Sequence, residues 1–276
     1  MIHKRSFVVS LAVLWLTTAA LAHVFWVQPM RYGVAVGDIV KVQLHVGDTF
    51  PGDIVPRDDE KIEKFVVEGP SGEKPAMGRD ADSIAAVFRP TQPGTYLIAY
   101  RSKPSPVTLE ADKFEAYLRD KGLEKIIELR ANAGQSSLPG REVFSRSAKA
   151  AIRVGDQRSD EVATKDLGFR VEIVPKSNPA SLKPGDALAL SVMSEGKPLA
   201  GALVQARNVE HPGARLVDRA DNKGQLSFTL AHAGVWVIDT VDMFAAPKDS
   251  GADWESVWAS LSFEIRLPAD SGKNKP

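Results

Sequence analysis

The chain contains no cysteine, only five histidines and no net formal charge across its 276 residues. The absence of cysteine excludes disulfides, thiolate metal ligands and cysteine nucleophiles. Eukaryotic secreted proteins of small modules usually carry disulfides, so an exported chain without cysteine is typical of a bacterial periplasmic protein that depends on its hydrophobic core. No Lys/Arg-rich run follows the first residues, so nucleic acid is not an expected partner.

Long hydrophobic runs are also scarce. The one candidate runs from Phe7 to Ala20. It follows Lys4 and Arg5, and its last residue begins the small-residue segment Ala20-Leu21-Ala22. Its length of about 14 residues is below the roughly 20 that a membrane-spanning helix needs. A positive start, an apolar run and small residues at the end are the pattern of a cleaved signal peptide. We therefore predict a signal peptide over residues 1–22, in preference to a membrane anchor, and a periplasmic mature chain that does not span the membrane.

Cleavage after Ala22 makes His23 the first residue of the mature protein. A terminal histidine offers two nitrogen donors, the α-amine and the imidazole, and copper and nickel favour such donors. Both groups must be deprotonated to bind, so we expect metal affinity to fall in mild acid. The alternative interpretation is that the processed end simply pairs as a strand.

Motifs that would indicate an enzyme are missing. The sequence has no GxSxG, no HExxH and no Gly-rich phosphate loop, so we predict a protein without catalytic activity. Spacing alone does not exclude a Ser-His-Asp triad, because triads assemble in space. A copper oxygenase that uses His23 as part of a histidine brace is a further alternative, and it requires a second histidine near His23.

Alternating hydrophobicity predicts a mainly β fold. Short strands are expected in the first half over 23–28, 39–46, 64–68, 85–89, 94–100 and 148–154, and in the second half over 169–174, 187–193, 202–208, 225–230, 234–241 and 258–266. Between them, residues 110–134 have helical spacing, with Gly122 separating two helices or bending one. The polar segment 155–165 is expected to link the two halves.

These patterns give two immunoglobulin-like or prealbumin-like β-sandwich domains with a small helical insertion. We expect an N-terminal sandwich over 23–157, which carries the insertion at 110–134. A C-terminal sandwich follows over 166–268, and a frayed polar tail occupies 269–276.

Two resemblances add to this interpretation. Gly196 to Val204 and Asp221 to Phe228 resemble the prealbumin-like modules of carboxypeptidase regulatory domains. Over the whole mature chain, the sequence resembles the NikM-like family of exported proteins of unknown function (domain of unknown function 4198), in the stretches His23–Pro29, Gly47–Gly52, Ala111–Leu118 and Ala252–Phe263. This resemblance implies a β-rich periplasmic protein associated with nickel or cobalt uptake. Family members commonly carry a histidine before the methionine of a late strand, where this chain has Asp242-Met243.

The candidate metal ligands besides His23 are few. His45 lies on the polar face of its predicted strand, His211 lies in a loop before Pro212, and His232 lies at a turn. No HxH or HxxxH pair occurs, so the sequence holds no self-contained metal motif. Asp242 would serve as an oxygen ligand if it replaces the family's histidine, and Asp239 is a second late carboxylate; the alternative is that both face solvent.

Aromatic residues offer another kind of site. Trp254 and Trp258 are four residues apart, which suggests a helical turn or an aromatic anchor, with Trp26 as a third member of a binding surface. Core packing is the competing interpretation.

Taken together, the sequence predicts a periplasmic protein that binds nickel, cobalt or copper through His23, His45, His232 and Asp242. It would then pass the ion to a metal-uptake transporter or another envelope protein. The alternative is a structural module that contacts protein or carbohydrate without metal.

Overall fold

The computed structural model describes residues 23–156 and 160–267, and it is mainly β with a small helical insertion, as the sequence predicts. The predicted signal peptide, 1–22, and the tail, 269–276, lie outside the described residues. Within the described residues, no helix is both long enough and apolar enough to cross a membrane.

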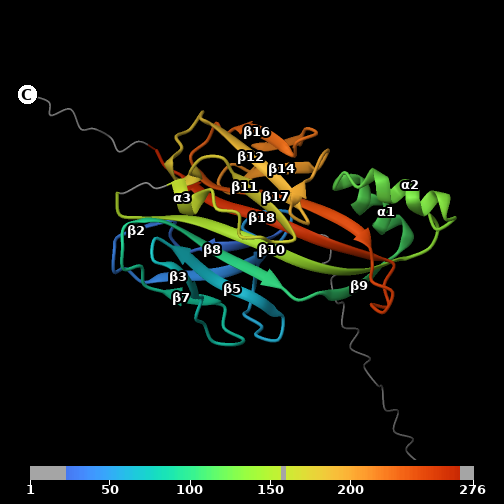
Figure 1. The fold of residues 1–276 in the computed structure, drawn as a ribbon, viewed down its shortest axis with the longest axis horizontal. Coiled ribbons are helices and arrows are strands. Elements are labelled where there is room, and N and C mark those ends of the chain that lie inside the picture. Colours follow the sequence, from blue (N-terminus) through green and yellow to red (C-terminus); the bar gives the residue numbers. More distant parts are fainter. Residues whose placement is uncertain (1–22, 157–159, 268–276) are drawn as a thin grey trace, which may run out of the picture.

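A ten-stranded sheet forms the centre of the molecule (Figure 1). Its main path runs, in spatial order, through β15 (Arg215–Arg219), β14 (Leu203–Asn208), β17 (Gly234–Ala245), β18 (Trp254–Ile265), β10 (Gly140–Val154), β8 (Gly94–Ser102), β5 (Ile62–Gly69) and β6 (Gly72–Pro75). Two further strands, β2 (Gly33–Val34) and β9 (Ser105–Leu109), also pair with β10.

The two halves of the chain meet inside this sheet. Strand β10 of the first half pairs in parallel with β18 of the second, from Glu142 opposite Trp254 to Ala150 opposite Ser262. Strands from before and after the expected linker, 155–165, are therefore hydrogen-bonded to each other in one continuous sheet. That segment also contains the short helix α3 (Asp160–Ala163), in which Val162 and Ala163 are buried.

One face of the central sheet is covered at its β5–β8–β10 end by a four-stranded sheet. This smaller sheet consists of β1 (Phe25–Pro29), β3 (Val40–Val46), β4 (Asp53–Val55) and β7 (Ala86–Phe88). Side chains alternate between the faces of a strand, and on β10 Ala148, Ala150 and Ile152 point into the core between these two sheets. We refer to these two packed layers as the N-terminal sandwich.

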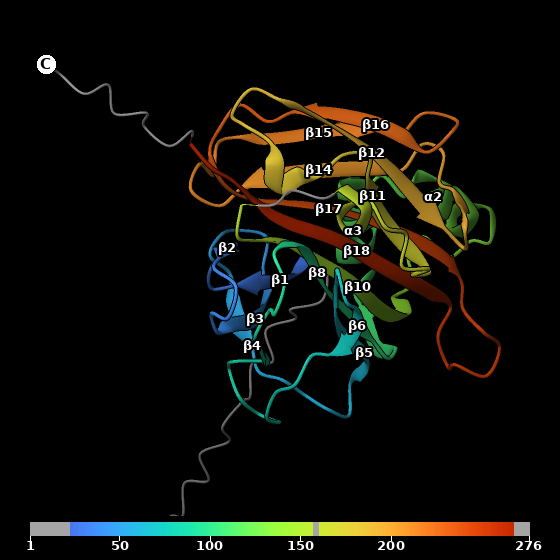
Figure 2. The same cartoon turned by 60° about the vertical axis from the view of Figure 1, so that its left-hand side comes forward.

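The opposite face of the central sheet packs against a third sheet. It contains β11 (Val171–Pro175), β12 (Ala187–Ser194), β13 (Lys197–Pro198) and β16 (Gln225–Thr229), and the short 3₁₀ helix Pro179–Ser181 lies between β11 and β12. Leu188, Leu190 and Val192 of β12 share a core with Trp236 and Phe263 of the central sheet. Figure 2 shows this layer and the N-terminal layer on opposite sides of β10 and β18.

The helical insertion follows its prediction closely. Helices α1 (Ala111–Asp120) and α2 (Glu124–Asn132) are separated at Gly122, and they pack Phe114, Leu118 and Ile126 against β17 and β18. The insertion covers the same face of the sheet as β1, because Trp258, which packs against the helices, and Ser262, which donates to the Val27 carbonyl of β1, lie on the same side of β18.

Of the two interpretations of the tryptophans, core packing is confirmed, whereas the helical turn and the binding surface are wrong. Trp254 and Trp258 lie on strand β18 and not on a helical turn, and both are buried with α1 and α2. Trp26 is buried in a separate cluster with Val24 and Val237. With exposed fractions of 7%, 6% and 1%, the three rings form core and not a binding surface.

Candidate functional site

His23 contacts a carboxylate that follows β3. The main chain places the two residues together, because Gly47 N–H donates to the carbonyl of Val24, which continues the β1–β3 register one step beyond Phe25 opposite Val46. Nε2 of His23 lies 3.2 Å from Oδ2 of Asp48, and both side chains remain accessible to solvent. An imidazole whose one nitrogen faces a carboxylate presents the other nitrogen to a ligand.

The loop that carries Asp48 is anchored to the central sheet. Arg207 of β14 donates from Nη1 to the main-chain carbonyl of Asp48 at 3.0 Å, and from Nη2 to Oδ1 of Asp239 at 2.6 Å. The same guanidinium lies over the ring of Phe50. Asp239 is buried and paired, so it does not face solvent. Asp239 of β17 thus holds Arg207, and Arg207 in turn holds the main chain at Asp48.

The sequence predicts that His45 lies on the open polar face of its strand. Its side chain is instead buried, with 7% exposed. Its ring packs against Trp26, its Nδ1 lies 2.9 Å from the carbonyl of Pro51, and its Nε2 lies 3.4 Å from the amide oxygen of Gln43. Burial lowers the pKa of His45, partly offset by the bond to the Pro51 carbonyl. Both ring nitrogens are thus engaged within the protein.

His232 and His211 form a pair that sequence spacing does not reveal. Their exposed rings stack with centroids 4.5 Å apart at an angle of 30°. The main chain holds both turns, since the carbonyl of His232 accepts from Trp236 Nε1 and the amide of His211 donates to Asn208. The structure therefore brings these two histidines together.

Asp242 lies on β17, partly buried, and its carboxylate accepts a hydrogen bond from the hydroxyl of Ser194 on β12 at 2.7 Å. Its second oxygen accepts from the amide of Met243. Across residues 23–156 and 160–267, no three histidine, aspartate or glutamate side chains come together as a metal cage. The predicted ligands His23, His45, His232 and Asp242 each contact different neighbours, which are Asp48, Pro51, His211 and Ser194 respectively.

A cavity of about 540 Å³ adjoins the Asp48 loop. Asp48 and Arg207 line it together with Asp120, Lys121 and Arg215 from the insertion and β15. The Lys121 ammonium lies 2.9 Å from the Asp120 carboxylate and over the ring of Trp258. Desolvation raises the pKa of Asp120, but the bond to Lys121 and nearby cations outweigh it, so the net pKa is lowered. Charges of both signs meet at this cavity.

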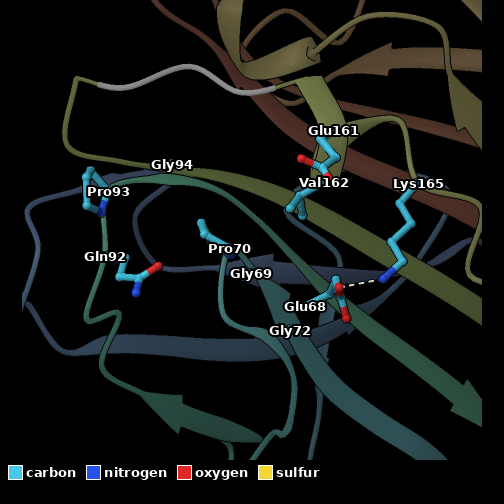
Figure 3. Close-up of a pocket in the computed structure, with 10 residues that line it drawn as sticks. All are labelled: Glu68, Gly69, Pro70, Gly72, Gln92, Pro93, Gly94, Glu161, Val162 and Lys165. Atoms are coloured by element: carbon cyan, nitrogen blue, oxygen red, sulfur yellow. Dashed lines mark hydrogen bonds and ion pairs between the residues drawn. The ribbon is translucent and has the colours of Figure 1, made fainter.

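A cavity of about 670 Å³ lies where α3 approaches the turns of the N-terminal sandwich (Figure 3). Lys165 extends across it to Glu68, with 2.6 Å between Nζ and Oε1. The remaining lining comes mainly from turn residues such as Pro70 and Pro93. None of the predicted ligands lines this cavity, and Lys165 is already paired with Glu68.

Sequence reasoning did not identify Asp48, Arg207 or the stacking of His211 on His232. The sequence pattern predicts only a turn at Asp48, and the register of β1 against β3 is what places it beside His23. Arg207 lies 159 residues from the carbonyl that it holds, so no local pattern marks it.

Comparisons with known proteins give a family but no assigned activity. The model of a domain of unknown function, DUF4198, matches residues 20–243. No curated protein matches the chain.

Among solved structures, the D0-D1 domain of intimin is 10% identical with a TM-score of 0.21, covering 86% of this chain and 96% of that one. Salmonella alpha-2-macroglobulin reacted with methylamine is 13% identical with a TM-score of 0.22, covering 90% of this chain and 15% of that one. Similarities at this level carry no argument about fold or function.

Proposed function

This chain belongs to the family of the domain of unknown function DUF4198, and we propose that it is an exported periplasmic protein that binds a transition-metal ion at His23. The ion is cargo: nickel, cobalt or copper passed to a metal-uptake transporter of the NikM-like kind or to another envelope protein. We further propose that the two halves are immunoglobulin-like or prealbumin-like sandwiches, the second of carboxypeptidase-regulatory type.

The contact between His23 and Asp48 carries this proposal. A carboxylate beside Nε2 of a histidine favours the tautomer that carries its proton on Nε2 and leaves a free lone pair on Nδ1, as in carboxylate–histidine–metal arrangements. Nδ1 is the ring nitrogen that closes a chelate ring with the α-amine of the same residue. Removal of residues 1–22 would create that amine, so export and metal binding become linked.

The donor set fits an open site better than a closed cage. His23 supplies two nitrogens, and no third histidine or carboxylate of the described residues completes a cage with it. Two nitrogen donors with positions left for water suit copper or nickel more than magnesium or calcium, which prefer oxygen ligands. An incomplete coordination sphere also suits a protein that must release its ion to a partner.

The deciding experiment is isothermal titration of correctly processed protein with nickel, cobalt and copper. Three variants are compared: the protein that starts at His23, the His23→Ala variant, and a protein with one extra glycine before His23. The added glycine keeps the imidazole but converts its α-amine into an amide. We expect tight binding only by the first protein.

Equal affinity in all three proteins would exclude His23 as the site. Absence of binding by the first protein would favour the second candidate, a structural or interaction module of the envelope. That candidate predicts a stable partner in periplasmic pull-downs without metal.

A further inference from the structure

A third cavity, of about 560 Å³, opens at the end of the N-terminal sandwich, away from the linker. Its apolar lining includes the rings of Phe25 and Tyr100 and the side chain of Leu44, all of them buried. Phe144 of β10 and Val55 of β4 complete the apolar part. The size falls within the range of pockets that take small organic ligands.

Arg146 of β10 lines this cavity from the core-facing side of its strand. Alternation places Arg146 on the same face as Ala148 and Ala150, which are core residues of the N-terminal sandwich. The backbone there is fixed, because the amide of Arg146 donates to the hydroxyl of Ser102 at 3.0 Å. The guanidinium lies over two rings, with Cζ 4.9 Å from the centroids of both Phe25 and Phe144.

No carboxylate or carbonyl of the described residues pairs with this partly buried guanidinium, in contrast to the fully buried cations of the fold. Arg207 pairs with Asp239, Lys149 pairs with Glu172, and Arg130 donates to two carbonyls and to Glu115. A guanidinium that lies over aromatic rings keeps its N–H donors in its own plane, at its edge. The donors of Arg146 therefore remain available to a molecule in the cavity.

Desolvation without a compensating anion lowers the pKa of Arg146 to about 10. The side chain is still charged at neutral pH, and burial of an unpaired charge costs stability. The fold thus maintains an unfavourable charge at a place where a bound anion would neutralise it.

The rim of the cavity restricts which anion fits. Asp58, Glu60 and Asp80 line it, while Lys61 is paired with Asp58. The other rim cation, Arg57, already donates to Asp59 and to the carbonyls of Ala76 and Ala85. This rim disfavours a polyanion, because its acids repel negative charge and its bases are already engaged.

We propose that this cavity binds a small monocarboxylate with an apolar or aromatic body, whose carboxylate pairs with Arg146. The carboxylate accepts two parallel N–H bonds from the guanidinium, which is the geometry that arginine favours. The body of the ligand packs against Phe25, Tyr100 and Phe144. This site is separate from His23, and it stands or falls independently of metal binding.

The test is titration of the protein with 3-phenylpropionate, followed by calorimetry and by the ring resonances of Tyr100 and Phe144 in NMR spectra. Phenylpropanol, which lacks the charge, and phenyl phosphate, which carries more charge, are the comparison probes. We expect 3-phenylpropionate to bind and the other two to bind at least tenfold more weakly.

Arg146→Met should weaken 3-phenylpropionate binding by about tenfold to a hundredfold, the usual loss for charge-assisted hydrogen bonds. Without ligand, this variant should unfold at the same temperature as the wild type or higher, because it removes an unpaired and partly buried charge. Arg141→Met is the matched control, since Arg141 is on the same strand, is exposed and lies outside the cavity lining.

Arg146→Lys keeps the charge but loses the planar pair of donors, so it should also bind weakly. If Arg146→Met does not fold, Arg146→Lys provides the test in its place. Absence of 3-phenylpropionate binding by the wild type would overturn the proposal. So would undiminished binding by the Arg146 variants, or tighter binding of phenyl phosphate.

Discussion

Arg207 and Asp239 form a buried ion pair across the neighbouring strands β14 and β17, with 2.6 Å between Nη2 and Oδ1. Their side chains are only 10% and 2% exposed. Because Arg207 also holds the carbonyl of Asp48, this pair connects the interior of the central sheet to the loop beside His23.

Asp239→Asn is therefore expected to destabilise the protein strongly. The substitution keeps the shape of the side chain but leaves the Arg207 charge buried without its anion, which typically costs about 3–5 kcal/mol. Urea unfolding measures the loss. The control is Glu264→Gln, which breaks the more exposed pair with Arg266 and should change stability by less than about 1 kcal/mol. Similar losses in the two variants would contradict the prediction.

Glu142 predicts an unusual pH dependence. It is 2% exposed beneath the insertion, and the hydroxyl of Ser256 donates to its Oε1. Desolvation raises the pKa of Glu142 from 4.5 to about 7. The unfolded chain therefore loses this proton at lower pH than the folded protein does, so stability falls as pH rises between about 4.5 and 7. The full effect is on the order of 3 kcal/mol.

Glu142→Gln should remove this slope, because glutamine does not ionise. We expect the variant to gain stability relative to the wild type at pH 8 and to gain little at pH 4.5. Urea unfolding across this pH range is the measurement, with Glu128→Gln, an exposed carboxyl of α2, as the control for loss of one charge. A wild-type stability that rises steadily from pH 4.5 to 7, with the same slope in Glu142→Gln, would refute the assignment.

Gly122 and Gly134 offer a matched comparison of backbone strain and close packing. Gly122 has φ of +68° and Gly134 has φ of +66°. A Cβ added at Gly122 would lie 2.6 Å from Cβ of Leu203, whereas a Cβ at Gly134 would meet nothing within 4 Å. Gly134→Ala should cost about 1–2 kcal/mol from the left-handed backbone alone.

Gly122→Ala should cost at least about 1 kcal/mol more than Gly134→Ala, because the insertion must shift away from β14. Thermal unfolding of the two variants gives the difference directly. If both variants lose the same stability, the insertion does not pack against β14 as closely as described.

Local patterns predicted much of this fold but not its central strand in full. The insertion and its division at Gly122 are confirmed, since helical spacing and a glycine suffice to indicate them. Strand β10 was predicted only over 148–154, although it begins at Gly140. Its first half carries the polar residues Glu142 and Arg146, where local alternation predicts no strand. They are in a strand because partners far along the chain surround them.

The candidate sites depend even more on distant partners. His23 is identifiable from the signal-peptide pattern, but Asp48 becomes its neighbour only through the β1–β3 register. His45 alternates as a polar strand residue, yet Trp26 and the loop carbonyl of Pro51 cover it. Alternation predicts which side of a strand a residue faces, and it does not predict what packs on that side.

Asp48 provides the sharpest test of the metal proposal beyond His23 itself. Asp48→Asn keeps the size of the side chain and leaves the main-chain carbonyl that Arg207 holds, so the loop should remain in place. It removes the charged acceptor beside Nε2 of His23. Loss of such an outer partner typically weakens metal binding by about tenfold to a hundredfold.

Titration of processed Asp48→Asn with copper and nickel should give that loss while urea unfolding of the metal-free protein stays near the wild-type value. Asp38→Asn is the control, because Asp38 is another exposed carboxylate of the same half, paired with Arg31. If Asp48→Asn binds metal as tightly as Asp38→Asn does, the carboxylate does not orient the imidazole. His23 would then bind, if at all, only as a free chain terminus.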